Sequence, residues 1–385
     1  MLLYWIWLSL RYALNEMERL TVLEHFDSPE DLYYADDARL SLLEDLSPKA
    51  KEALLDKSLE EAEGILAACA QKRIHILPFG VPRYPSALRS IPDPPTVLYY
   101  RGKLPKYDLA PLIGVVGTRK ASAYGLDAAG LMGRELAGHG AVVVSGMAAG
   151  IDAAATQGAL TAGQYAVGVL GCGVDVIYPR SCRALFQKME QLGCLISEYP
   201  PGTPPNSWHF PRRNRIISGM SQGILVVEAP EKSGALITAQ RALDQGRDVY
   251  VVPGNLGVAT CQGSNALLRS GAMAVTCGWD ILSEYAQQYP AGLHEKRLPL
   301  PQPDKKDIDK DAPVAYSGVE QPADDLDETE KAILSALGDR EQLIDSVIAG
   351  IDLPSGDVLA ALTLLEVKGY VITRPGGWAR ASKIH

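Results

Sequence analysis

Metal-ligating residues are scarce in this 385-residue sequence, which contains six cysteines and six histidines. The cysteines form no C-x-x-C pair and the histidines show no ligand spacing, so no metal site is expected. Scattered thiols of this kind are typical of a reducing compartment, and we therefore expect a cytoplasmic protein.

Long hydrophobic runs are also missing, because no stretch approaches the roughly 18 apolar residues that a membrane-spanning helix requires. We therefore expect no membrane span. The apolar start, residues 1–10, lacks the basic region and the cleavage site of a signal peptide, and charged residues follow it at helical spacing. It is expected to form a core helix of a small domain.

An excess of basic charge is absent too, because the net charge is −9 at pH 7. Taken alone, this argues against a protein that binds polyanions over its whole surface. The acidic surplus is uneven, however, since residues 111–290 contain 13 basic and 12 acidic side chains. A phosphate-binding surface is therefore expected in the middle of the chain.

The composition divides the chain into five segments, four of which flank the middle. Residues 1–75 carry helical apolar stripes and predict a small helical domain, whereas the proline-rich residues 76–111 suit an extended lead-in. Residues 290–325 are proline-rich and charged, which predicts a flexible linker. Residues 326–385 predict three helices and a two-stranded wing. The many acidic residues of this winged-helix-like domain favour docking to a protein at least as much as binding to duplex DNA.

The middle segment, residues 112–289, alternates short apolar runs with longer amphipathic stretches. Strands that are apolar on both faces and joined by helices are typical of a parallel sheet covered on both sides. We therefore predict an α/β fold with a Rossmann-like, mostly parallel sheet and helices on both faces. The predicted strands are 112–116, 141–144, 166–170, 195–197, 224–228, 248–252 and 272–275, and the predicted helices include 124–138, 151–161, 183–192 and 235–245.

Glycines and basic residues follow the carboxyl ends of several predicted strands, where open parallel sheets bind ligands. Glycines let backbone amides approach a phosphate, and guanidinium groups bind phosphate in a bidentate manner. This pattern predicts a phosphate-binding edge, although each loop alone is also compatible with a simple turn. The candidate residues are Gly117, Thr118, Arg119, Lys120, Gly146, Gly171, Tyr178, Arg180, Ser233, Gly234 and Thr238.

The segment at 208–215 combines aromatic and basic side chains. Aromatic faces beside cations are typical of sites that hold unstacked bases on a phosphate chain. The alternative is that Phe210 belongs to the core and that the arginines form a solvated face. The candidates added by this segment are Phe210, Arg212, Arg213, Asn214 and Arg215.

Several enzyme classes can be weighed against the sequence. The loop after the first predicted strand is G-T-R-K rather than G-x-G-x-x-G, and no P-loop occurs, so neither NAD nor another cofactor is expected. Residues 219–223 match G-x-S-x-G, but they follow a helix and precede a strand, so Ser221 is interpreted as a turn residue. No catalytic residue is assigned. The open alternative is a nucleotide-hydrolysing enzyme that uses Glu228 or Asp152 as its acid.

Taken together, these segments resemble the bacterial DNA-processing protein A family, also called Smf, over residues 80–285. The resemblance is specific because the motifs occur in the family's order. Those motifs are V-V-G-T-R-K-A-S-A-Y-G (115–125), S-G-M-A-A-G-I-D (145–152), G-C-G-V-D-V-I-Y-P (171–179), F-P-R-R-N-R-I-I-S-G (210–219), S-G-A-L-I-T-A (233–239), V-P-G (252–254) and G-S-N-A-L-L-R-S-G-A (263–272).

The resemblance implies a non-enzymatic, homodimeric single-stranded-DNA-binding protein. Such proteins protect incoming DNA during natural transformation and help to load RecA recombinase. It implies that the Gly117–Arg119 loop holds phosphate, that Arg180 makes a second backbone contact and that Phe210 stacks a base. Arg212, Asn214 and Arg215 would line the wall, Ser233, Gly234 and Thr238 would hold an anion, and Leu267 and Leu268 would lie on the dimer face. A duplex-binding regulator acting through the winged helix remains the other alternative.

The sequence departs from the family pattern at three places. Ala149 and Thr156 stand where the family often has a basic residue and a histidine, which puts a DNA role for that loop in doubt. The first domain, of the SAM or helix-hairpin-helix type, usually carries a Gly-Ile-Gly turn, and residues 11–15 lack both glycines. Duplex binding by residues 1–75 is therefore not expected.

Overall fold

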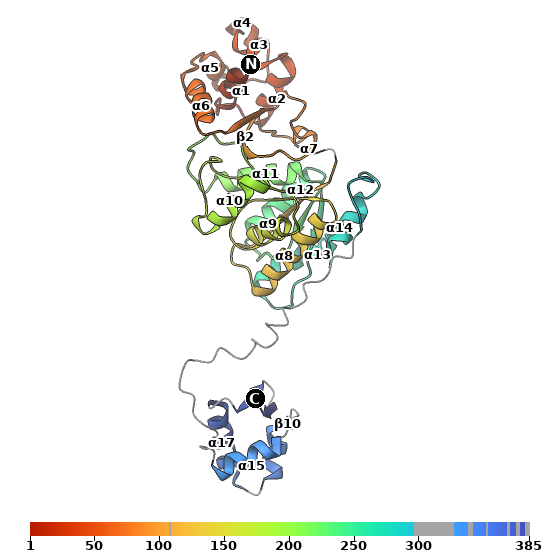
Figure 1. Cartoon of the computed structure of the whole chain (residues 1–385). Coiled ribbons are helices and arrows are strands. Elements are labelled where there is room, and N and C mark those ends of the chain that lie inside the picture. The colour runs from red at the N-terminus through yellow and green to blue at the C-terminus, as the bar shows by residue number, and fades with distance from the viewer. Residues whose placement is uncertain are drawn as a thin grey trace. The chain divides into compact units, whose positions relative to one another are not determined.

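The computed structural model describes residues 1–107, 109–295, 327–337, 342–351, 353–367, 370–374 and 378–381. The chain divides into two compact units, Met1–Pro299 and Leu300–His385. The first is coloured red to cyan and the second blue in Figure 1. Most of the predicted linker lies outside the described residues.

The N-terminal part of the first unit is helical, as predicted. Two of its helices begin at the serine–proline pairs, where Ser28 accepts a hydrogen bond from the Asp31 amide and Ser47 from the Ala50 amide. The apolar start forms a core helix in which Trp7 is fully buried, which confirms that expectation. The helices are α1 (Leu2–Ser9), α2 (Glu16–His25), α3 (Pro29–Tyr33), α4 (Asp37–Ser41), α5 (Pro48–Leu55) and α6 (Glu60–Gln71).

The described residues of the first unit build one nine-stranded sheet in the order β1-β2-β6-β5-β4-β3-β7-β8-β9. All neighbours from β6 to β9 pair in parallel, whereas β1 and β2 are antiparallel. The strands are β1 (His75–Pro78), β2 (Val97–Gly102), β3 (Leu112–Val116), β4 (Val142–Ser145), β5 (Ala166–Leu170), β6 (Cys194–Ser197), β7 (Gly223–Val226), β8 (Asp248–Val251) and β9 (Met273–Ala274). The prediction of a mostly parallel Rossmann-like sheet is confirmed.

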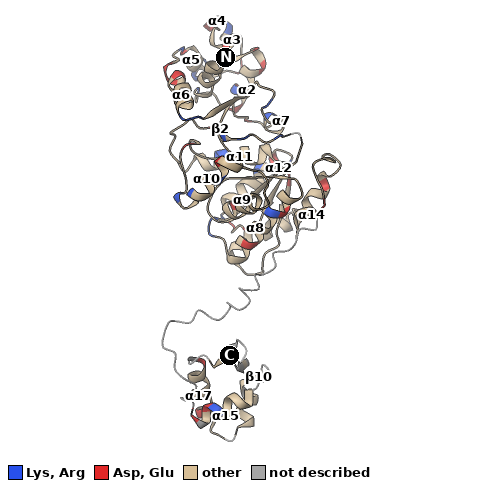
Figure 2. Cartoon of the chain, in the orientation of Figure 1, with Lys and Arg blue, Asp and Glu red and all other residues tan. Residues whose placement is uncertain are grey.

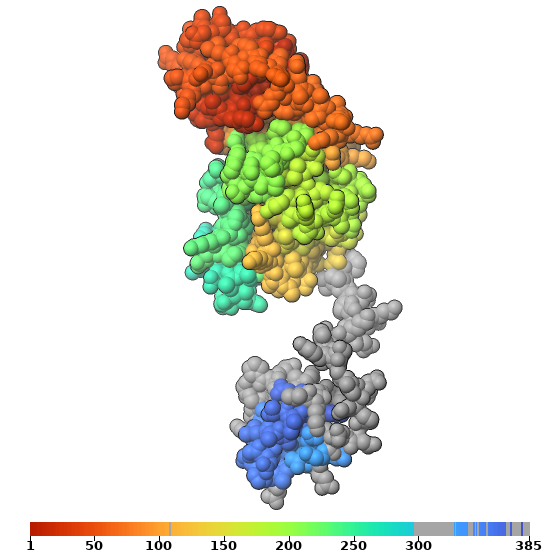
Figure 3. Space-filling view, turned by 90° about the vertical axis from the view of Figure 1, so that its left-hand side faces the viewer, coloured from red at the N-terminus to blue at the C-terminus, as the bar shows by residue number. Residues whose placement is uncertain are grey.

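The proline-rich lead-in differs from the expectation. It is part of the folded unit, because it supplies β2 and most of β1 and the short helix α7 (Ser86–Arg89). Its prolines lie at strand ends or between strands, as with Pro78 at the end of β1, and antiparallel edge strands tolerate this placement. The helical part packs against this region, since Trp5 joins the central core and its ring lies 6.3 Å from that of Phe79. Figure 3 shows the red-orange N-terminal residues lying directly against the green residues of the sheet region.

Helices cover both faces of the sheet, as predicted. One core cluster contains Met132, Ala155 and Phe186 from α8 (Ala123–Gly138), α9 (Ile151–Thr161) and α10 (Arg183–Leu192). The opposite cluster contains Ile216 and Ala239 from α11 (His209–Met220) and α12 (Gly234–Asp244). Further short helices close the unit, namely η1 (Arg180–Cys182), η2 (Ala259–Cys261), α13 (Gln262–Arg269), α14 (Gly278–Leu282) and η3 (Ser283–Tyr285).

The direction of strand progression reverses between β3 and β7. From β3 the chain builds outward through β4, β5 and β6, and it then returns through α11 to place β7 on the other side of β3. Open parallel sheets bind ligands at such a switch point, outside the carboxyl ends of the strands. The return connection also brings the aromatic and basic segment of α11 to this crevice.

The second unit has the predicted winged-helix composition. Three helices, α15 (Glu328–Leu337), α16 (Ile344–Gly350) and α17 (Ser355–Val367), pack around Ile333, Val358 and Leu365. Strands β11 (Val371–Arg374) and β12 (Trp378–Ala381) form the wing. The sequence did not predict β10 (Gln342–Leu343), which pairs with β12.

In the described part of the chain, no helix has the length and apolar character needed to cross a membrane. The same residues contain no group of three or more His, Cys, Asp and Glu side chains placed to hold a metal ion.

Candidate nucleic-acid interface

A pocket of about 650 Å³ opens at the switch point between β3 and β7, and we call it the switch-point pocket. Residues from the loops after β3 and β7 and from the first turns of α11 and α12 line it. The predicted site residues that line it are Gly117, Thr118, Arg119, Lys120, Tyr178, Phe210, Arg213, Asn214, Ser233, Gly234 and Thr238.

Two amides of the loop after β3 make structural hydrogen bonds. The Thr118 amide donates to the Glu228 carbonyl at 2.7 Å, and the Lys120 amide donates to the Thr118 hydroxyl at 3.2 Å. Gly117 is required because a Cβ there would overlap the side chain of Ile151. The exposed side chains of Arg119 and Lys120 are the cations that this loop offers to a phosphate.

Phe210 carries the aromatic surface of the pocket. Its ring is half-buried, stacks on Tyr178 at 5.4 Å between centroids, and lies 5.2 Å from the Arg119 guanidinium. Gly171 does not line the pocket but lies beneath this ring, because a Cβ there would come within 2.8 Å of it. The arrangement is a cation beside two stacked aromatic rings at an open pocket.

Arg213 is a buried member of the wall. It is 4% exposed and donates to the carbonyls of Gly146 at 2.8 Å and of Val169. Burial lowers the pKa of Arg213 to about 10, against the opposing effect of Asp152. Gly146 leaves room for this contact, because a Cβ there would lie 2.7 Å from the Arg213 guanidinium. Gly146 thus packs against the Arg213 guanidinium and does not line the pocket.

The start of α12 forms the opposite wall. Ser233 caps this helix by accepting from the Ala235 amide at 3.2 Å, and Gly234 is exposed with no neighbour within 4 Å of a Cβ position. Asn214 and Thr238 both donate to the Gly234 carbonyl at 3.4 Å. A helix N-terminus of this kind favours an anion. Sequence reasoning missed Lys232, an exposed cation that lines the pocket, and its position directly before the capping serine is the signal that could have found it.

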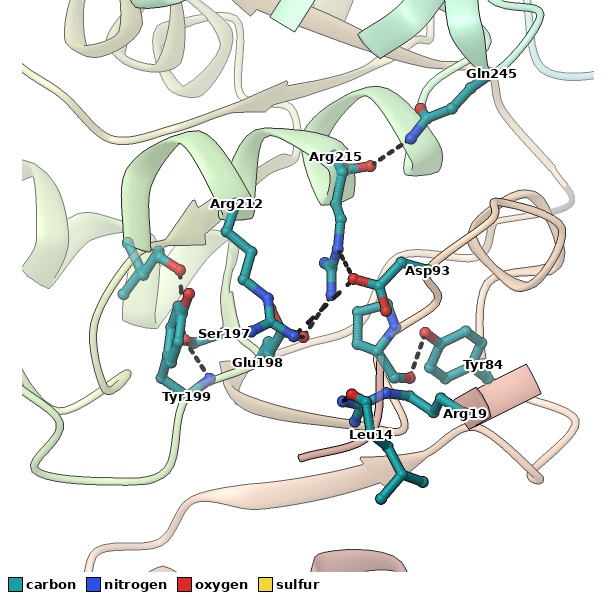
Figure 4. Close-up of polar contacts among 12 residues, drawn as sticks. Leu14, Arg19, Tyr84, Asp93, Ser197, Glu198, Tyr199, Arg212, Arg215 and Gln245 are labelled. Atoms are coloured by element: carbon teal, nitrogen blue, oxygen red, sulfur yellow. Dashed lines mark hydrogen bonds and ion pairs between the residues drawn. The ribbon is translucent and has the colours of Figure 1, made fainter. Parts of the chain in front are cut away.

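Three predicted arginines lie outside the pocket. Arg180 is exposed at the start of η1, and Arg212 and Arg215 line a neighbouring groove. Arg215 is nearly fully buried between Asp93, whose carboxylate is 2.8 Å away, and Glu198 (Figure 4). Burial alone would lower the pKa of Arg215, but the two carboxylates raise it. The expectation that Arg215 lines the pocket wall is not met, because its side chain points away from the pocket and pairs with Asp93 and Glu198 inside the fold.

The acids proposed for an enzyme are held by structural contacts. Glu228 is fully buried and accepts hydrogen bonds from the Ser122 amide at 2.9 Å and from the Thr260 hydroxyl. Asp152 lines the pocket but accepts from the amides of Gly146 and Ala148. Burial raises the pKa of Asp152, although Arg213 opposes this shift. Both carboxylates therefore accept hydrogen bonds that hold loops and helix ends in place.

The positions that depart from the family pattern have local roles. Thr156 is buried and donates to the Asp152 carbonyl at 2.8 Å, whereas Ala149 is half-buried. Asn15 begins α2 through a reciprocal capping box with Glu18, in place of a glycine turn. Leu267 and Leu268 on α13 are partly buried against the core.

Comparison with known proteins gives two matching families. Residues 75–286 match DNA recombination-mediator protein A, and residues 319–377 match the DprA winged helix domain. Protein Smf of Synechocystis sp. is 33% identical over 386 residues, covering 97% of each chain. DNA processing protein DprA of Bacillus subtilis is 42% identical over 224 residues, covering 58% of this chain and 75% of the relative.

Two solved structures are similar as well. The X-ray structure of DprA from Streptococcus pneumoniae has a TM-score of 0.64 and 32% identity, covering 74% of this chain and 98% of that one. A structure of DprA from Helicobacter pylori, described for its single-stranded DNA binding mode, has a TM-score of 0.51 and 29% identity. It covers 56% of this chain and 97% of its own. The chain therefore belongs to the DNA recombination-mediator protein A family.

Proposed function

We propose that this recombination mediator binds single-stranded DNA in the switch-point pocket. The observation that carries the proposal is the exposed Arg119 guanidinium beside the stacked rings of Phe210 and Tyr178. A flexible strand requires both elements, because cations bind its phosphates and aromatic faces stack its bases without selecting a sequence. The relative from Helicobacter pylori, whose structure is described as binding single-stranded DNA, supports this choice of ligand.

The pocket offers phosphates two kinds of partner. Arg119, Lys120 and Lys232 are exposed and can reach a strand from both walls, while the N-terminus of α12 at the exposed Gly234 favours an anion through its helix dipole. Arg213 contributes positive charge from below without leaving its carbonyl partners. Figure 2 shows basic residues, in blue, on α11 within this region. Affinity would come from these charges and tolerance of sequence from stacking.

The bound strand would be held without chemical change. Hydrolysis of a nucleotide would need an acid directed at the sugar, and Glu228 and Asp152 are both engaged by the amides that they position. This commitment supports a binding protein over the nucleotide-hydrolysing alternative.

The further roles proposed are protection of incoming DNA in the cytoplasm during natural transformation and loading of RecA by a homodimer. Support for a dimer comes from the far edge of the sheet, where α13 with Leu267 and Leu268 adjoins β9. The exposed Met273 and Leu256 add apolar surface near this edge. The acidic second unit is proposed as a protein-docking module.

The test is the affinity of labelled oligo-dT and of duplex DNA, measured by fluorescence anisotropy across a salt titration. Arg119→Ala should weaken oligo-dT binding about fivefold at 0.1 M salt, because each lost phosphate contact reduces the salt slope by about 0.7. Lys49→Ala, an exposed cation of the N-terminal helices, is the matched control. Unchanged affinity and salt slope for Arg119→Ala would refute the pocket assignment, and release of free base from nucleotides would favour the enzyme.

A further inference from the structure

A second basic cavity adjoins the switch-point pocket. This cavity of about 750 Å³, the arginine groove, lies between the start of α2 and the helices α11 and α12. Pro211 and Ile237 line both cavities, so the two cavities meet at these residues. The cations that line the arginine groove are Arg19, Arg212, Arg215 and Arg241.

The cations of the groove outnumber its anions. Four guanidinium groups face three carboxylates, those of Glu16 and Asp93 in the lining and that of Glu198 beside it. Arg215 takes the close contacts to Asp93 and Glu198. Figure 4 shows Arg212 and Arg215 converging on Glu198, with Arg19 on the opposite side of Asp93.

Two of the four cations are left with weak or no ion pairs. Arg212 is 35% exposed, and its carboxylate contacts are long, at 4.0 Å to Asp93 and 3.8 Å to Glu198. Arg241 is exposed near the end of α12, and no ion pair is found for it in the described part of the chain. These guanidinium groups can turn toward a ligand without breaking a buried contact.

The buried pair of cations is under-satisfied. Among the described residues, the Nη1 atom of Arg215 and the Nε atom of Arg19 are buried with no hydrogen-bond partner. Arg19 is 7% exposed and donates to the Leu14 carbonyl at 3.2 Å, and no ion pair is found for it among the described residues. A buried cation without an ion pair, such as Arg19, is stabilised by an anion that enters beside it.

We propose that the arginine groove is a second subsite for the same DNA strand, in which Arg212 and Arg241 bind phosphates that leave the switch-point pocket past Ile237. This inference rests on the proposed function. A phosphodiester fits better than an acidic peptide, because the groove continues the pocket and presents planar guanidinium forks to it. The N-terminal helices would then contribute to binding a single strand through Arg19, without the glycine turn used for a duplex.

The experiment compares the full chain with Arg212→Gln/Arg241→Gln on two labelled dT oligomers, one of about 4 and one of about 16 nucleotides, which span the site sizes of single-strand-binding folds. The wild type should gain affinity from the short to the long oligomer. In the double variant this gain should fall about 25-fold at 0.1 M salt, with a salt slope smaller by about 1.4, because two phosphate contacts are lost. Lys49→Gln/Arg83→Gln removes two exposed charges that line neither cavity and is the matched control.

The outcomes separate the two proposals. If the double variant gains as much as the wild type while Arg119→Ala weakens both oligomers, the groove is not a subsite although the pocket is. An equal loss for both oligomers would also overturn a separate subsite. If the wild type binds neither oligomer, the proposed function fails and the groove assignment fails with it.

Discussion

Replacing Phe210 with alanine tests the stacking role of the switch-point pocket. The ring is half-buried, with Tyr178 stacked on it at 5.4 Å and Arg119 5.2 Å away, so the substitution removes the central member of the assembly. Base–aromatic stacking contributes about 1–3 kcal/mol per base in alanine substitutions. Each 1.4 kcal/mol is a factor of about ten, so the Kd for oligo-dT should rise about 5- to 150-fold.

The salt dependence distinguishes this loss from a charge effect. Stacking releases no counterions, so Phe210→Ala should leave the slope of log K against log salt unchanged, whereas Arg119→Ala should reduce it. Phe210→Trp, which keeps an aromatic face above Gly171, is the control and should retain most of the affinity. Fluorescence anisotropy of labelled oligo-dT at several salt concentrations is the assay, and thermal unfolding checks that each variant is folded. A Kd for Phe210→Ala within twofold of the wild type would refute the stacking role.

Three further predictions concern stability and domain roles. Arg215→Met should lower the free energy of unfolding by about 3–5 kcal/mol in urea titrations, because Asp93 and Glu198 lose their buried partner. Arg212→Met, which removes longer contacts, should lower it by at most about 1 kcal/mol. Equal losses in the two variants would contradict the assignment of Arg215 as the buried ion-pair partner. Burial raises the pKa of Asp93, but Arg215 more than offsets this effect, so the pKa is lowered in the folded state. The stability that this carboxylate contributes should therefore be lost as the pH falls below about 4. Asp93→Asn should flatten that part of the curve of Tm against pH, and an unchanged curve would contradict the ion pair. Deletion of residues 326–385 should leave oligo-dT affinity within about twofold, whereas its loss would favour a winged-helix DNA reader.

Much of the fold follows from local patterns in the sequence. The alternation of apolar runs with amphipathic stretches predicted β3 to β9 and their covering helices, because a doubly covered parallel sheet requires strands that are apolar on both faces. Ser28-Pro29 and Ser47-Pro48 are local signals for the starts of α3 and α5, because each cap is made within the first turn. The antiparallel strands β1 and β2 escaped prediction, since β1 pairs with β2, β2 pairs with the distant β6, and prolines surround both strands.

The location of the candidate site at the carboxyl edge of the sheet was predictable, but the contacts of its individual side chains were not. The glycine and basic loops belong to strand ends, so their convergence followed from the topology. Arg212, Arg213 and Arg215 are almost adjacent in sequence, yet one lines the pocket from below and two face the groove. What separates them is their direction on α11 and the position of partners such as Asp93, which lies 122 residues from Arg215 in the sequence. Sequence spacing carries no information about such partners.

The most direct test of the central claim is photocrosslinking of an oligo-dT strand that carries iodouracil, followed by identification of the crosslinked peptides by mass spectrometry. If a single strand lies in the switch-point pocket, the crosslinks should fall on Phe210 and Tyr178, whose rings form the exposed aromatic surface there. They should decrease when unlabelled oligo-dT competes. Crosslinks confined to the second unit, or spread over the helices α3 to α5, would contradict the account.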